Sequence, residues 1–99
     1  MANYSVTCNL RIVHPAYRCQ NLDLRLSSVD SVQDGYASVG NFVRSVSTMY
    51  GAIGSELEYV MSTLWTEMKA PKPKQLFDVS RSNANPSVDL RLSIRANNV

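Results

Sequence analysis

One unbroken helical pattern of apolar residues runs through the middle of the chain and constrains the fold more than any other feature. The steps between its members alternate between four and three residues: Val32, Tyr36, Val39, Val43, Val46, Tyr50, Ile53, Leu57, Val60 and Leu64. Residues three and four apart lie on the same face of an α-helix. The pattern therefore predicts one long helix, or two helices in line, resting on an apolar surface.

Capping signals mark where the helical segments begin. Ser31 is followed three residues later by Asp34, and Ser55 by Glu58. A serine with an acidic residue three positions on satisfies backbone N–H groups that have no partner within the first helical turn. Two glycines, Gly51 and Gly54, lie just before the second signal. We expect a first helix up to about residue 50 and a second over about 56–68, or one helix bent at the glycines.

Strict alternation of apolar and polar residues predicts strands on both sides of the helical segment. The alternating stretches are Tyr4–Ile12, Leu22–Ser27 and Val88–Arg95, and a shorter one is Gln75–Ser80, with Phe77 and Val79 facing inward. A period of two with one polar face is typical of a half-buried strand. Pro15 separates the first two strands, and we expect them to form an antiparallel hairpin.

Strand pair, helical segment and strand pair together predict an α+β fold in two layers, formed by residues 1–99 as one domain. The expected sheet has about four antiparallel strands, two from each end of the chain. The long central helix, or two in-line helices, covers one of its faces. The order of the strands stays open, because both hairpins can pair in several registers.

The composition excludes some classes of protein. The net charge of +2 is too small to indicate nucleic-acid binding by itself. No apolar run approaches the roughly 20 residues that cross a bilayer, and the first residues lack the pattern of a secretory signal. We expect an intracellular protein with no membrane-surface role, in which Cys8 and Cys19 are reduced thiols. A disulfide between them is the alternative, and it needs a tight turn near Val13 and His14.

No catalytic constellation is present. Cys8 could be a nucleophile with His14, the only histidine, as its base. Cys8 has the strand parity of Val6 and Leu10, however, which predicts a buried structural thiol. Two cysteines and one histidine do not complete a four-ligand zinc site. We therefore expect neither an enzyme nor a metal or other cofactor.

Two features suggest RNA binding as an alternative function. The segment Gly51–Gly54 resembles the GxxG loop between two helices of KH domains, which clamps a nucleic-acid backbone. Ala52 and Ile53 replace the polar or basic residues usual in that loop, and Glu56 and Glu58 add negative charge. The second feature is a set of arginines on the outward parity of the strands, Arg11, Arg25, Arg91 and Arg95. The aromatic platform on which single-strand binders stack bases is missing there.

Self-association or binding to another protein is the function that the sequence favours. Additional apolar residues flank the main helical pattern: Phe42, Met49, Met61, Trp65 and Met68. They widen the apolar arc beyond the roughly 100° that covers a sheet. Tryptophan and methionine are frequent at protein interfaces. We therefore expect these five residues to form a protein interface, and the chain to form a homo-oligomer or to bind another protein.

The order of these elements resembles the core of rhabdovirus-type viral matrix proteins. In that family a strand precedes a helix that ends near an aromatic–Gly turn, and a second apolar helix and later strands follow. The matching pieces are Tyr4–Val13, Val39–Tyr50 with Gly51, Leu57–Leu64 and Val88–Ile94. The resemblance implies a small viral structural or accessory protein in an infected host cell, which binds copies of itself or another protein.

This chain departs from that family in two respects. Residues 18–31 insert a strand, and the basic N-terminal tail and proline-rich tyrosine motif of the family are absent from the sequence. Membrane binding and budding depend on those features, so the resemblance does not extend to them.

Overall fold

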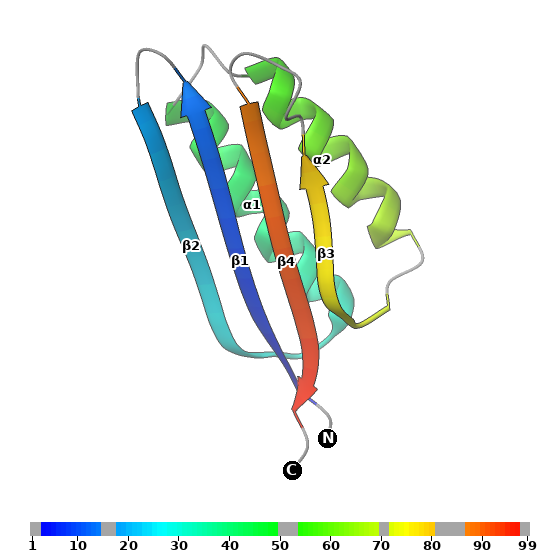
Figure 1. The fold of residues 1–99 in the computed structure, drawn as a ribbon. Coiled ribbons are helices and arrows are strands. Elements are labelled where there is room, and N and C mark those ends of the chain that lie inside the picture. Colours follow the sequence, from blue (N-terminus) through cyan, green and yellow to red (C-terminus); the bar gives the residue numbers. More distant parts are fainter. Residues whose placement is uncertain (1–2, 15–17, 50–53, 70–71, 81–86, 98–99) are drawn as a thin grey trace.

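Four strands and two helices make up the described part of a computed structural model of the chain (Figure 1). The structure describes residues 3–14, 18–49, 54–69, 72–80 and 87–97. In chain order the elements are β1 (Asn3–His14), β2 (Arg18–Val29), α1 (Val32–Met49), α2 (Gly54–Met68), β3 (Lys74–Ser80) and β4 (Ser87–Asn97).

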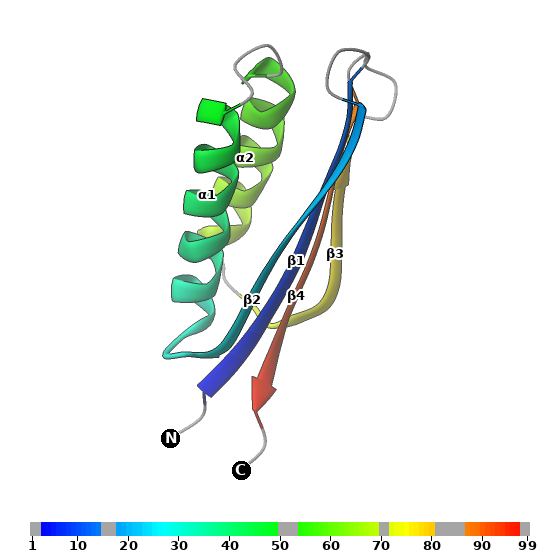
Figure 2. The same ribbon diagram turned by 90° about the vertical axis from the view of Figure 1, so that its left-hand side faces the viewer.

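The strands form one antiparallel sheet in the order β2-β1-β4-β3. The expected N-terminal hairpin is the pair β1–β2, and β3 and β4 form a second hairpin. The two hairpins join through β1 and β4, which pair along nearly their whole length, from Asn3 opposite Asn97 to Val13 opposite Ser87. Both helices cover the same face of the sheet (Figure 2). The predicted two-layer α+β fold is confirmed.

The helices differ from the expected in-line arrangement, because α1 and α2 lie side by side (Figures 1 and 2). The width of the sheet explains this arrangement. An unbroken helix over the whole apolar pattern would be about 50 Å long and would cover only a strip about 10 Å wide. Two helices side by side cover four strands at about 4.8 Å spacing. Accordingly α1 contacts β1 and β2, and α2 contacts β4 and β3.

The core lies between the helices and the sheet. The helical pattern supplies Val32, Tyr36, Val39, Val43, Val46, Leu57, Val60 and Leu64. The inward residues of the strands supply Val6, Cys8, Leu10, Ile12, Val79, Val88, Leu90, Leu92 and Ile94. Among the described residues, seventeen are buried in this cluster. Cys8 is among them, as its strand parity predicts.

The start of α1 is capped as the sequence predicts. The Asp34 backbone N–H donates to the Ser31 hydroxyl oxygen at 3.0 Å, and Gly35 N–H donates to the Ser31 carbonyl at 3.1 Å. The first contact satisfies a donor that has no partner within the first turn, and the second is the first hydrogen bond of the helical ladder. Ser31, two residues after the end of β2, therefore holds the first turn of α1.

The edge strand β3 is short and irregular. Its pairing with β4 shifts between Lys74 and Phe77, so two residues of β3 lie opposite one residue of β4. Val79 is buried and Phe77 half-buried, so the predicted inward positions are confirmed. The irregularity leaves Leu76 on the outer face with 63% of its surface exposed.

Candidate functional site

An apolar hollow of about 110 Å³ lies between α1 and α2, on the side of the helices away from the sheet. Its walls are Met61, Leu64, Trp65 and Met68 from α2, and Ala37, Gly40, Asn41 and Arg44 from α1. Gly40 helps to keep it open, since a Cβ atom there would meet nothing closer than the Met61 Cε at 3.9 Å. A cavity of about 150 Å³ can hold benzene, so this hollow has room for one aliphatic side chain.

Trp65 is the exposed member of the hollow. It is the only tryptophan of the chain, and 61% of its surface is exposed. Met61 and Met68 are half-buried and pack against the core beside it. Three of the five residues predicted for a protein interface thus line one surface, which we call the α1–α2 hollow.

The other two predicted interface residues lie on the opposite flank of α1. Gly40 and Arg44 face the hollow. Phe42 is two positions from each, about 200° around the helix, and Met49 is seven positions from Phe42 and shares its flank. Phe42 is half-buried against the core, whereas Met49 is 70% exposed. The structure therefore divides the predicted interface into two surfaces.

The open face of the sheet brings together the four arginines predicted as an RNA-binding surface. Arg11 on β1, Arg25 on β2, and Arg91 and Arg95 on β4 all point away from the helices, and all are exposed. The same face also carries three carboxylates: Asp23, Asp78 and Asp89. The charges of the described side chains on this face are therefore nearly balanced.

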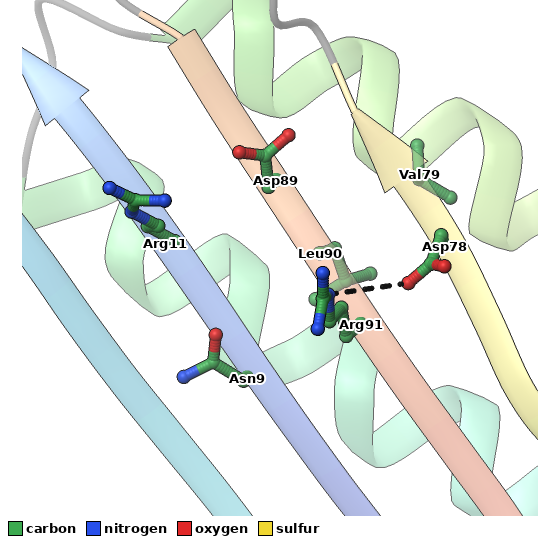
Figure 3. A pocket seen from close by; sticks show the side chains of 7 residues that line it. All are labelled: Asn9, Arg11, Asp78, Val79, Asp89, Leu90 and Arg91. Carbon is green, nitrogen blue, oxygen red and sulfur yellow. Dashed lines mark ion pairs between the residues drawn. The ribbon is translucent and has the colours of Figure 1, made fainter.

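A shallow polar hollow of about 450 Å³ lies on this face across β1, β4 and β3, toward the ends of β1 and β3 (Figure 3). The Arg91 Nε lies 3.7 Å from the Asp78 Oδ1, and Arg11 lies opposite Asp89 in the β1–β4 register. On the neighbouring strand pair the Asn9 amide donates to Asp23 at 2.9 Å. The Arg91 guanidinium thus has a carboxylate nearby, which lowers its attraction for phosphate, whereas the Arg11 Nε donates to the Cys19 Sγ at 3.4 Å.

The glycine junction predicted as an alternative RNA site lies mostly outside the described residues. Gly51, Ala52 and Ile53 lie outside the described residues, whereas Gly54 is the first residue of α2. The similarity of this segment to a KH loop stays a prediction.

The thiol of Cys8 is shielded from solvent. It is 4% exposed, and its pKa is raised to about 12, chiefly because burial disfavours the thiolate and secondarily because of the nearby Asp23 charge. A thiol must ionise to act as a nucleophile. Cys8 is therefore a core residue at neutral pH. Over the described ranges, no group of three or more His, Cys, Asp or Glu side chains is placed to share a metal ion.

Two residues of these surfaces were not singled out by the sequence. Arg44 borders the α1–α2 hollow with its charged side chain, and Leu76 is exposed on the open face of the sheet. Helical spacing places Arg44 near the hollow only once the position of α2 is known. The exposure of Leu76 depends on the irregular pairing of β3, for which the sequence carries no clear signal.

No protein-family model, curated protein or solved structure shows significant similarity to this chain. The resemblance to viral matrix proteins therefore stays a prediction from the order of the elements. In the described part of the chain, neither helix combines the length and apolar character that spanning a bilayer requires.

Proposed function

We propose that this protein works by protein–protein contact through the α1–α2 hollow, and not by catalysis. Self-association is the form of contact that we favour, and binding of a different protein is the other. The observation that carries the proposal is the placement of a largely exposed tryptophan beside an apolar hollow.

The energetics of Trp65 support this function. A tryptophan side chain buries roughly 200 Å² when it is covered, at about 25 cal/mol per Å². With 61% of the residue exposed, covering it would contribute roughly 3 kcal/mol to an association. Tryptophans that fill a pocket at the centre of an interface are frequent hot spots of binding energy. Met61 and Met68 add adaptable apolar surface around it.

Light scattering across protein concentrations, at two salt levels, tests the proposal. We expect a discrete dimer or larger species at micromolar concentration, and Trp65→Ser should weaken its formation by roughly tenfold or more. Leu76→Ser is the matched control, because Leu76 is 63% exposed but lies on the opposite side of the molecule. It should leave the association unchanged.

The fluorescence of Trp65 gives a local readout of the same contact. Because the chain has one tryptophan, a shift of its emission to shorter wavelength with rising concentration would report that this side chain becomes covered. A chain that associates while the emission of Trp65 stays constant would contradict self-association through the hollow. If a different protein covers the hollow, the shift should appear only when that protein is added.

RNA binding is the second candidate, favoured by the gathering of four arginines on the open face of the sheet. We place it second because Asp23, Asp78 and Asp89 share that face. Replacing Arg25 and Arg95 together by serine should weaken binding of single-stranded RNA and lower the salt dependence by about 1.4. Lys69 and Lys72, exposed on the connector after α2, provide a control with the same loss of charge.

The junction version of RNA binding has a separate test. Replacing Gly51 and Gly54 by aspartate should abolish RNA binding if this segment clamps a phosphate backbone. Fluorescence anisotropy with a labelled single-stranded RNA measures both sets of variants. Wild-type protein that binds no RNA at low salt would contradict both versions.

A role as a small viral structural or accessory protein in an infected cell also belongs to this proposal. The order of β1, α1, α2 and β4 supports it, because it follows the order in the core of viral matrix proteins. Self-assembly through an apolar surface is the property that such a protein would need.

A further inference from the structure

The two edges of the sheet differ in how they are protected from further strand pairing. Strand β3 has seven residues and an irregular register. Strand β2 has twelve residues and pairs with β1 without a shift from Arg18 to Leu26. Short strands and bulges hinder edge-to-edge pairing, whereas a long regular edge offers a row of backbone N–H and C=O groups. Within the described part of the chain, no strand lies on the outer side of β2.

The apolar layer is also incomplete at the β2 edge. Leu22, Leu24 and Leu26 point toward the helices but are only half-buried. Their neighbours on β1, Leu10 and Val6, are fully buried. These leucines are thus covered less completely by their own chain than the β1 residues beside them.

The exposed flank of α1 continues this apolar border. Strand β2 lies at the edge that faces the viewer in Figure 2, and α1 is the nearer of the two helices there. The flank of α1 that carries Phe42 and Met49 faces away from α2, and therefore toward this edge. These residues form one surface, which we call the β2 edge surface. It consists of the half-buried Leu22, Leu24 and Leu26 on β2, and of the half-buried Phe42 and the exposed Met49 on α1.

The charges of β2 select a particular register for pairing with a second copy. In an antiparallel pair of two β2 strands, a two-fold axis normal to the sheet lies between the strands. It is level with one residue of β2, which is then directly opposite its own copy. An axis at Asp23 or Arg25 sets like charges opposite each other. With an axis at Leu22 or Leu26, neither Asp23 nor Arg25 lies opposite a residue of opposite charge. With the axis at Leu24, Asp23 of each copy lies opposite Arg25 of the other. Opposite charges directly across strands are stabilising, and like charges are destabilising.

From these observations we propose that a second copy of this chain pairs with β2, antiparallel and centred on Leu24. The result is a two-fold symmetric dimer with an eight-stranded sheet. Both helical layers lie on the same side, and the open faces of the two sheets form one continuous surface. This dimer goes beyond the function proposed above, because its surface is separate from the α1–α2 hollow and leaves the hollow free.

The dimer also fits the dimensions of the helical layer. Strands are about 4.8 Å apart, and α1 lies over β1 and β2. The α1 helices of the two copies would therefore lie about 10 Å apart, which is the distance of packed helices. Their facing flanks carry Phe42 and Met49. An isologous contact of this kind uses the same patch on both copies and closes at two.

Charge reversal at two positions tests the register. Asp23→Arg alone sets arginines opposite arginines, and Arg25→Asp alone sets aspartates opposite aspartates. Each variant should dimerise roughly tenfold to a hundredfold more weakly than wild type, because two symmetry-related pairs change sign. An equimolar mixture of the two variants restores opposite charges at both pairs and should form a heterodimer. Arg95→Asp is the control, since Arg95 lies on β4 in the interior of the sheet.

A disulfide at the axis provides a test that does not depend on charge. In the proposed register the two copies of residue 24 lie directly opposite, about 5 Å apart between Cα atoms, which a disulfide can bridge. Cys8 lies directly opposite residue 24 on β1, so it must be replaced as well. Leu24→Cys, with Cys8 replaced by alanine and the exposed Cys19 by serine, should form a covalent dimer under mild oxidation. Leu22→Cys and Leu26→Cys should not, because an axis at Leu24 places each about four residues from its own copy.

Three results would overturn the proposal. The first is wild-type protein that stays monomeric at every concentration. The second is a dimer that neither charge reversal weakens. The third is cross-linking as efficient at residue 22 or 26 as at 24. A dimer that is weakened by Trp65→Ser and not by the charge reversals would support the α1–α2 hollow and reject the β2 edge. The opposite pattern would support the β2 edge and leave the hollow to another partner.

Discussion

At Gly35 the backbone of α1 lies close to side chains of the sheet. A Cβ atom at this position would lie 3.1 Å from the Val6 Cγ2 and 3.2 Å from the Ile94 Cδ1. Both distances are shorter than an ordinary van der Waals contact, so these two side chains would have to shift by a few tenths of an ångström to admit a Cβ atom. Glycine destabilises a helix by about 1 kcal/mol relative to alanine, but here it allows close contact with the two central strands.

We predict that alanine has different effects at the two glycines of α1. Gly40→Ala should raise the free energy of unfolding by up to about 1 kcal/mol, because its Cβ would meet only the flexible end of Met61. Gly35→Ala should bring no gain, since overpacking costs about 1–3 kcal/mol and offsets the helix preference. Urea unfolding followed by circular dichroism measures both. Equal stabilisation by the two variants would contradict the close packing at Gly35.

Cys8 makes the stability depend on pH in the alkaline range. The pKa of its thiol is raised from 9.0 to about 12 in the folded chain, so the neutral form is favoured by folding. Between pH 9 and 12 the unfolded chain ionises this thiol while the folded chain does not. The free energy of unfolding should therefore fall by about 1.4 kcal/mol per pH unit in this window. Below pH 9 the thiol has no effect on the pH dependence.

The variant Cys8→Ala tests this linkage. It should be less stable than wild type at pH 7 because it loses core packing, but its stability should decline less steeply above pH 9. Cys19→Ala, which removes an exposed thiol, is the control for the loss of a cysteine outside the core. Parallel slopes for wild type and Cys8→Ala from pH 9 to 11 would show that Cys8 ionises as easily in the folded chain as in the unfolded one.

At the scale of single elements, the first turn of α1 depends on one hydroxyl group. Because Ser31 accepts from the Asp34 N–H, Ser31→Ala should lower the free energy of unfolding by about 1 kcal/mol. Ser45 lies in the interior of the same helix and donates to the Asn41 carbonyl. Ser45→Ala should be neutral or slightly stabilising, since alanine is the better helix former. Thermal unfolding of the two variants compares them, and equal losses would contradict a specific cap.

The elements were predictable from sequence to different degrees. Period-two alternation located all four strands, and the capping signal at Ser31 located the start of α1 within one residue. The apolar pattern identified the buried face of both helices. Its unbroken phase, however, fits two helices side by side as well as two in line, because either arrangement turns the same stripe toward the sheet. Only the width of the sheet distinguishes them.

The candidate surfaces needed information that the sequence does not contain. The residues Phe42, Met49, Met61, Trp65 and Met68 were expected in one interface, because helical spacing shows that they border the stripe but not on which side the neighbouring helix lies. Asp23 and Asp89 lie in identical Asp-Leu-Arg-Leu-Ser segments. Strand order alone places the first on an edge and the second in the interior of the sheet. The role of β2 as an open edge was therefore not visible before the pairing was known.

At the scale of the whole molecule, self-association should appear in the thermal stability. Any contact made only by folded chains raises the unfolding midpoint as concentration rises. We expect the midpoint of the wild-type chain to increase over a hundredfold range of protein concentration. A variant carrying both Trp65→Ser and Arg25→Asp should lose this dependence, because it is altered at both proposed surfaces. Calorimetry measures the midpoints, and a wild-type midpoint independent of concentration would contradict both contacts.

The pairing of β1 with β4 has a consequence for how the protein is made. These two strands form the centre of the sheet, yet they are the first and last elements along the described chain. During synthesis on the ribosome, Leu10 and Ile12 of β1 lack their neighbours on β4 until β4 has emerged. Contacts between segments so distant in sequence form slowly, since the whole intervening chain must be ordered first. The nascent chain therefore exposes its apolar layer until β4 has been synthesised.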